Sequence, residues 1–106
     1  MKIKPGANIQ GLQLPMRAVL IDANRIWLMH GQELVITGGL DGEHSPGSMH
    51  YYGYALDLRT NYFADSDECI DVAKELESCL GRKYYVRFER DHIHVHYRMQ
   101  FIVIDS

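Results

Sequence analysis

The chain has 106 residues, of which 46% are hydrophobic and 24% charged, and its formal net charge is −3. This length fits a single domain over residues 1–106 with one hydrophobic core, and the apolar fraction excludes disorder along most of the chain. The small negative charge creates no field that would attract nucleic acid or anionic lipid, and no apolar run approaches the roughly 20 residues needed to span a bilayer. We therefore expect a monomer with no nucleic-acid or membrane partner.

The amino terminus and the cysteines bear on where the chain is made. Residues 1–6 include basic side chains but no apolar segment follows them, so no signal peptide is visible. Cys69 and Cys79 lie ten residues apart in one predicted helix. Ten residues of helix advance about 15 Å, beyond the reach of a disulfide. Both are expected to be reduced, half-buried thiols, which indicates cytoplasmic synthesis.

The first half of the chain is predicted to contain one helix and one short strand. Residues 1–14, rich in glycine and proline, are expected to be an irregular lead-in. A helix is predicted from Met16 to about His30, because apolar residues recur there at helical spacing. Pro15 suits its first turn and Gly31 its end. A strand is predicted at residues 33–37. The buried face of the helix is expected to hold Met16, Val19, Leu20, Ala23, Ile26 and Trp27.

The second half begins with a strand and continues with the clearest helix of the chain, residues 65–80. Asp65 and Glu68 can form a capping box at its start, and Gly81 is a natural end. Its buried stripe is expected to consist of Ile70, Val72, Ala73, Leu76 and Leu80.

Four segments of the second half, including the strand that begins it, are predicted to be strands. They are the second half of residues 48–60, a hairpin of 83–89 with 92–97 around Arg90-Asp91, and a last strand at 101–104. Together these elements predict an α+β domain in which two helices pack on a mostly antiparallel sheet.

Histidine is the one unusual feature of the composition, with six in the chain and three of them within residues 92–96. Side chains two apart on a strand share a face, so His92, His94 and His96 should line up. His50 precedes Asp57 by seven residues. Imidazole nitrogens and carboxylate oxygens are standard zinc ligands, and a catalytic zinc needs three protein ligands with an open fourth position. The spacing alone fits equally well a solvated strand face with titratable side chains.

Two segments resemble the motifs of a known family. Residues 48–57, Ser-Met-His-Tyr-Tyr-Gly-Tyr-Ala-Leu-Asp, are similar to the S-x-H-x-x-G-x-A-x-D signature of the zinc D-alanyl-D-alanine carboxypeptidases. That family includes phage L-alanyl-D-glutamate endolysins and, by structure, the Hedgehog amino-terminal domain. Residues 91–94, Asp-His-Ile-His, resemble its second motif, an acid three positions before the third zinc-binding histidine. The resemblance covers about residues 34–97 and implies a Hedgehog/DD-peptidase-like fold.

The resemblance also implies roles for individual residues. His50, Asp57 and His94 would bind a Zn²⁺ ion. Asp91 matches the family's general base, normally a glutamate, which takes a proton from the attacking water and returns it to the leaving amine. His44 and His92 resemble two histidines that Hedgehog domains place beside their zinc, and both are candidate catalytic residues.

The chain departs from the family pattern near the predicted metal. His96 replaces an acid two residues after the third ligand, where it could hold a ligand in its tautomer or crowd the metal. Residues 37–41 lack the substrate-binding arginine of many members, so oxyanion stabilisation would come from other groups, such as His44 or His92. Arg59 is a candidate for binding a substrate carboxylate, with a surface ion pair as the alternative.

The general base is a further departure. Asp91 is shorter than the usual glutamate, and strict strand alternation would put it on the face opposite His94. It can act as the base only if it lies in the turn, and Glu89 is the other candidate.

These patterns lead us to expect a zinc-dependent peptidase that cleaves cell-wall peptides, as a carboxypeptidase or an endolysin. The alternatives are a catalytically silent Hedgehog-like zinc domain that binds a peptide or a partner, and a zinc-free structural domain. The small size and the lack of a visible signal peptide fit a phage-encoded protein that acts at the host cell wall.

Overall fold

The computed structural model describes residues 1–39 and 53–98. Five strands and two α-helices make up this part of the chain, and a short 3₁₀ turn precedes the first α-helix. In chain order they are β1 (Lys2–Ile3), the 3₁₀ turn η1 (Leu14–Met16), α1 (Arg17–Met29), β2 (Val35–Gly38), β3 (Ala55–Arg59), α2 (Ser66–Leu80), β4 (Tyr84–Glu89) and β5 (His92–Tyr97).

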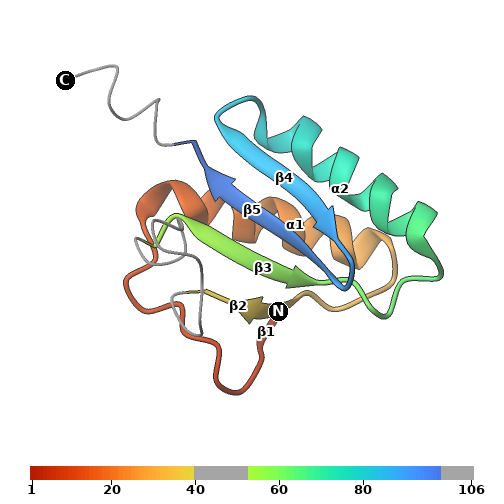
Figure 1. Cartoon of the computed structure of the whole chain (residues 1–106), viewed down its shortest axis with the longest axis horizontal. Helices are drawn as coiled ribbons and strands as arrows, with labels where there is room; N and C mark the ends of the chain where they lie inside the picture. Colours follow the sequence, from red (N-terminus) through yellow and green to blue (C-terminus); the bar gives the residue numbers. More distant parts are fainter. Residues whose placement is uncertain (40–52, 99–106) are drawn as a thin grey trace.

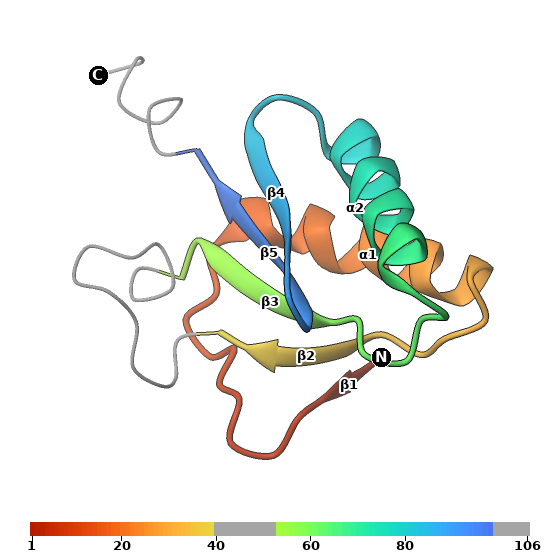
Figure 2. The same cartoon turned by 45° about the vertical axis from the view of Figure 1, so that its right-hand side comes forward.

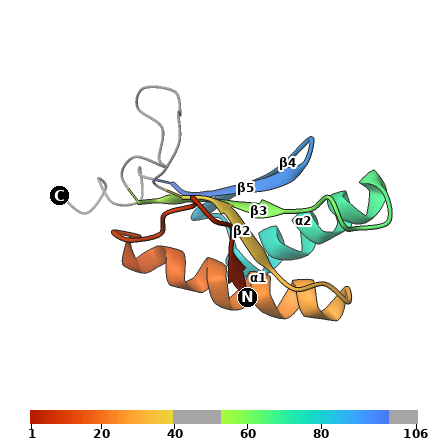
Figure 3. The ribbon, with the colours of Figure 1, turned by 90° about the horizontal axis from the view of Figure 1, so that it is seen from below.

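The strands form one sheet in the order β1-β2-β3-β5-β4 (Figures 1 and 2). The β1–β2 pair is parallel, and the other three pairs are antiparallel. Both helices lie on the same side of the sheet (Figure 3). The predicted α+β architecture, two helices on a mostly antiparallel sheet, is therefore confirmed. Neither helix described is long and apolar enough to cross a membrane.

Helix α1 forms close to where its periodicity predicts. Pro15 lies in the 3₁₀ turn, whose last residue Met16 directly precedes the helix, and Gly31 follows its end with φ of +78°. The predicted apolar face is buried except for Leu20, which is half-buried. Trp27 lies in the core as predicted, and its indole Nε1–H donates to the backbone oxygen of Arg59 at 2.9 Å. This bond fixes the end of β3 against α1.

Helix α2 begins with the predicted cap in a slightly altered form. Asp65 Oδ1 accepts the amide of Glu68 at 2.9 Å, while Glu68 Oε1 accepts the amide of Ala64 at 2.8 Å, one residue before the standard capping-box donor. The prediction that Ile70 is buried is wrong, because its exposed fraction is 40% whereas that of Cys69 is 5%. Cys69 precedes the buried stripe residues by three, four and seven positions, and Ile70 is rotated from it by about 100°. The buried residues of α2 are Cys69, Val72, Ala73 and Leu76.

Both cysteines are free, but neither is half-buried as predicted. Cys69 is buried in the core, and Cys79 is exposed and accepts a hydrogen bond from Arg25 Nη2 at 3.2 Å. The difference follows from the helix, which turns the two positions to opposite environments.

The expectation of an irregular lead-in over residues 1–14 is wrong at its start. Strand β1 pairs in parallel with β2, through bonds from the Lys2 amide to the Leu34 oxygen at 2.8 Å and from the Lys4 amide to the Ile36 oxygen at 2.9 Å. Two residues are too few to show an alternating pattern, so this edge strand is defined by its partner alone. The predicted strand at 101–104 lies outside the described residues.

The two faces of the sheet differ sharply in chemistry. The face against the helices carries fully buried apolar side chains, Ile36, Leu56, Leu58, Ile93 and Val95. Their neighbours along the strands, Asp57, Arg59, His92, His94 and His96, alternate with them and are only half-buried. Because side chains alternate along a strand, packing of the apolar set against α1 and α2 places the polar set on the face opposite the helices.

Candidate metal centre

Strand register brings the two sequence motifs together. In the antiparallel β3–β5 pair, Asp57 lies directly opposite His94, and Arg59 lies opposite His92. Directly paired residues point to the same face and have their Cβ atoms about 5 Å apart. The structure therefore places Asp57 and His94, which are predicted zinc ligands from different motifs, side by side.

A continuous series of polar contacts runs through these residues. Asp57 Oδ1 lies 3.2 Å from His94 Nδ1, and the opposite ring nitrogen of His94, Nε2, lies 2.8 Å from His96 Nδ1. In the other direction, Asp57 Oδ1 lies 3.8 Å from His92 Nε2. His92 Nδ1 in turn lies 2.9 Å from Asp91 Oδ1. The face opposite the helices thus carries a row of two carboxylates and three imidazoles, in the order Asp91, His92, Asp57, His94 and His96.

The Asp57–His94 pair fits a zinc ion in donor type and in separation. Two ligand atoms at 2.0–2.1 Å from a tetrahedral zinc lie about 3.3 Å apart, close to the observed 3.2 Å. The side chains of Asp57 and His94 are 18% and 17% exposed, so their neighbours hold them in place while a ligand can still reach them. A Cβ atom added at Gly38 would lie 2.7 Å from Asp57 Oδ2, so the glycine provides the room in which this carboxylate sits.

Two predicted residues, the zinc ligand His50 and the candidate catalytic residue His44, lie outside the described residues. Within 1–39 and 53–98, no three histidine, cysteine, aspartate or glutamate side chains form a group that could hold a metal ion. The predicted site needs His50 as its third ligand.

His96 contacts the ring of the predicted ligand His94. It contacts Nε2 of His94, the ring nitrogen turned away from Asp57. Its own ring stacks on Tyr85, with centroids 4.7 Å apart and planes 14° from parallel. If the Nε2–H of His94 donates to His96, then Nδ1 of His94 carries a lone pair toward Asp57 and a metal. In that tautomer His96 would hold His94 as a ligand, which is one of the two roles considered for it.

Asp91 lies in the turn between β4 and β5, which is the condition under which it could act as a base. The preceding residue, Arg90, has φ of +54°, and the backbone oxygen of Asp91 accepts the amide of Thr60 at 3.4 Å. Its side chain is 73% exposed. The hydrogen bond from His92 lowers the pKa of the Asp91 carboxyl, which keeps this group ionised at neutral pH but makes it a weaker base.

Glu89, the other candidate base, also faces His92. Glu89 Oε2 lies 3.5 Å from His92 Nε2, and its side chain is 45% exposed. His92 is therefore the imidazole that both candidate bases share, and it connects them to Asp57.

A polar hollow of about 250 Å³ adjoins this row, and it brings the candidate residues Arg59, Asp91 and His92 together with three that the sequence does not single out. Its walls come from four separate segments of the chain, so no local pattern could indicate how they meet. The lining residues are Lys4, Thr37, Arg59, Asn61, Asp91 and His92. The Thr37 hydroxyl donates to the backbone oxygen of Asp57 at 3.4 Å, which ties the hollow to the predicted metal ligand.

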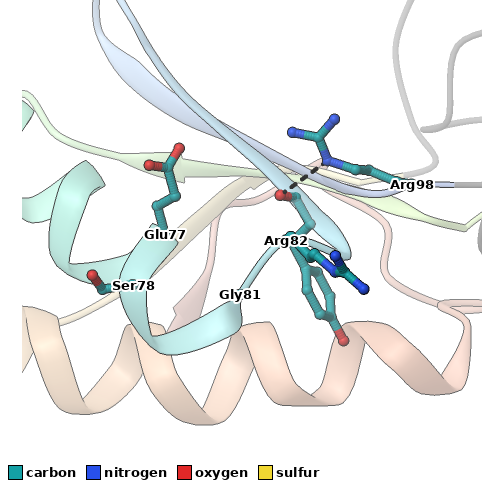
Figure 4. Close-up of a pocket in the computed structure, with 6 residues that line it drawn as sticks. Glu77, Ser78, Gly81, Arg82 and Arg98 are labelled. Atoms are coloured by element: carbon teal, nitrogen blue, oxygen red, sulfur yellow. Dashed lines mark hydrogen bonds between the residues drawn. The ribbon is translucent and has the colours of Figure 1, made fainter.

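A larger hollow, of about 450 Å³, lies elsewhere, between the end of α2 and strand β4 (Figure 4). There the Nε of Arg98 donates to the backbone oxygen of Tyr84 at 3.4 Å. None of the predicted site residues that the structure describes lines this hollow. Its lining residues are Glu77, Ser78, Gly81, Arg82, Tyr84 and Arg98.

No protein-family model, curated protein or solved structure matches this chain.

Proposed function

We propose that this chain is a zinc-dependent peptidase of cell-wall peptides with a Hedgehog/DD-peptidase-like fold. His50, Asp57 and His94 are its metal ligands, and a peptidoglycan peptide is its substrate. The observation that carries the proposal is the direct pairing of Asp57 with His94, at 3.2 Å on the sheet face opposite the helices. Asp57 belongs to the first of the two motifs that resemble the zinc family, residues 48–57, and His94 belongs to the second, residues 91–94.

The side chains of the sheet face opposite the helices suit the steps of peptide hydrolysis. A bound zinc ion would supply a Lewis acid that polarises the scissile carbonyl and lowers the pKa of water. His96 holds His94 in the tautomer that binds metal, through the 2.8 Å contact at Nε2. Asp91, kept ionised by His92, accepts the proton of the attacking water and returns it to the leaving amine. His92 lies between Asp91 and Asp57 and orients the Asp91 carboxylate toward the metal ligands.

A second function, a catalytically silent zinc domain that binds a peptide or a partner, is favoured by one specific observation. The Asp91 side chain is 73% exposed and its carboxylate is already bonded to His92. A general base normally lies within hydrogen-bond reach of the proton it removes. If Asp91 does not reach the water, then the same ligands would hold a purely structural zinc.

Metal content and turnover of the whole chain separate these functions. Protein expressed with zinc supplied is analysed for metal by mass spectrometry, alongside Asp57→Asn and a matched control, His30→Gln, which removes a histidine at the far end of α1. We expect about one zinc in the wild type and in the control, and a large loss in Asp57→Asn. Circular dichroism checks that each variant is folded.

Turnover is then followed on a panel of muropeptides by chromatography and mass spectrometry. The peptidase predicts cleavage that EDTA abolishes and added zinc restores. Asp91→Asn should lower kcat by about 10²- to 10⁴-fold with zinc content unchanged, and a larger loss in Glu89→Gln would move the base to Glu89. Zinc without turnover would establish the silent domain, and folded protein without zinc would refute both functions.

A further inference from the structure

The polar hollow beside the candidate metal centre combines two cations with few competing acids. Among the described residues that line it, the cationic groups are Lys4 and Arg59 and the acid is Asp91, whose carboxylate is bonded to His92. Within residues 1–39 and 53–98, neither Lys4 nor Arg59 takes part in an ion pair, whereas nearby Lys2 pairs with Glu33 at 3.4 Å. The lining is therefore net positive and suits a small monoanion.

Both cations are held on fixed backbone. The Lys4 amide bonds to the Ile36 oxygen at 2.9 Å, and its own carbonyl accepts the Ala7 amide at 2.9 Å. Arg59 is paired with His92 across the sheet, and its carbonyl accepts the Trp27 indole. Lys4 directly follows β1 and Arg59 is the last residue of β3, so both side chains reach the hollow from backbone that the sheet holds.

We infer that this hollow binds the carboxyl-terminal carboxylate of the peptide substrate, an inference that rests on the proposed peptidase function. The Arg59 guanidinium forms the bidentate contact that carboxylates favour, and Lys4 adds a second charge. Asn61, which also lines the hollow, adds an amide donor.

The position of the hollow sets which bond is cleaved. Arg59 lies two residues beyond Asp57 on β3, about 6.8 Å along the strand, which matches one or two residues of an extended peptide. The volume of about 250 Å³ is below the 300–1,000 Å³ of sites for drug-sized ligands, and it suits a chain end. The hollow thus makes the protein an exopeptidase that releases one or two residues from a free carboxyl end, rather than an endopeptidase.

A binding experiment tests the hollow without requiring turnover. Full-length ¹⁵N-labelled protein is titrated with N-acetyl-D-alanine and, separately, with N-acetyl-D-alanine amide, which lacks the charge. We expect the acid to shift the amides of Thr37, Asn61 and His92 saturably, with a Kd of about 1 mM, and the amide to bind at least about ten-fold more weakly. Equal binding of the two probes, no saturable shift, or shifts centred on His94 instead would overturn the inference.

Charge-neutral variants localise the effect. Lys4→Gln and Arg59→Gln should each weaken binding of the acid by about five-fold or more, the factor expected for the loss of about 1 kcal/mol. Lys2→Gln, two residues along β1, and Arg87→Gln, on the same sheet face, remove the same charge outside the hollow and should bind as the wild type does. Wild-type binding in Lys4→Gln and Arg59→Gln would refute the assignment.

Turnover distinguishes this inference from the proposed function. In an active protein, Arg59→Gln should raise KM for peptides with a free carboxyl end by about five-fold or more and affect kcat less. Equal cleavage of amidated peptides would refute the carboxylate site while the peptidase stands. Selective acid binding without any turnover would leave the hollow established and refute the peptidase.

Discussion

Gly38 offers a perturbation that reaches the candidate metal centre without touching a ligand. An alanine Cβ at this position would lie 2.7 Å from Asp57 Oδ2 and 3.3 Å from its Cβ and Cγ. Ordinary contacts need about 3.5 Å, so Gly38→Ala should displace the carboxylate by roughly 0.8 Å. Zinc–ligand distances tolerate only about 0.2 Å. We expect the substitution to weaken zinc binding by about 10- to 100-fold, as other changes around metal ligands do.

The fold should survive this change. The φ of Gly38 lies outside the left-handed region, so alanine is compatible with the backbone. Alanine also lowers the conformational entropy of the unfolded chain, which stabilises the folded protein by about 0.4–1 kcal/mol. This gain offsets part of the strain from the close contact. Zinc affinity is measured by competition with a chromophoric chelator, and stability by urea unfolding in EDTA. Zinc affinity equal to that of the wild type would refute the placement of the Asp57 carboxylate in the metal site.

Three other predictions follow from the described contacts. His96→Ala should lower zinc affinity by about 10- to 100-fold in the same chelator competition, because His94 loses the partner that sets its tautomer; unchanged affinity would exclude that role. The hydrogen bond to Glu68 raises the pKa of His30, so the stability lost in His30→Gln should be greatest at about pH 5–6 and shrink as pH rises above about 6.5. A loss in urea midpoint that grows with pH would contradict this sign. Leu58→Ala, in the fully buried part of β3, should cost about 2–5 kcal/mol in urea unfolding, whereas Ile21→Ala, 70% exposed on α1, should change it by less than about 0.5 kcal/mol; similar losses in both would contradict the assigned core.

Local patterns were sufficient where an element carries its own signal. The strand at 92–97 was predicted with its observed bounds, because Ile93 and Val95 alternate with histidines and a turn precedes them. Helix α2 was predicted from its cap and its stripe. The error at Ile70 arose because hydrophobicity favours isoleucine over cysteine, while the geometry of the helix decides which of the two faces the core.

Features that depend on pairing between distant segments could not be predicted in this way. Strand β1 has two residues and exists only through its pairing with β2. The resemblance named Asp57 and His94 as ligands, but their 3.2 Å contact depends on a strand register that no local pattern contains. The bridging position of His92 and the inclusion of Lys4 in the hollow have the same origin.

The most direct test of the zinc site is anomalous diffraction at the zinc absorption edge, on crystals of the whole chain grown with zinc supplied. The proposal predicts a single strong peak within about 2.0–2.2 Å of ligand atoms of His50, Asp57 and His94. A peak at other side chains, or no peak beside Asp57 and His94 in zinc-supplied crystals, would contradict it.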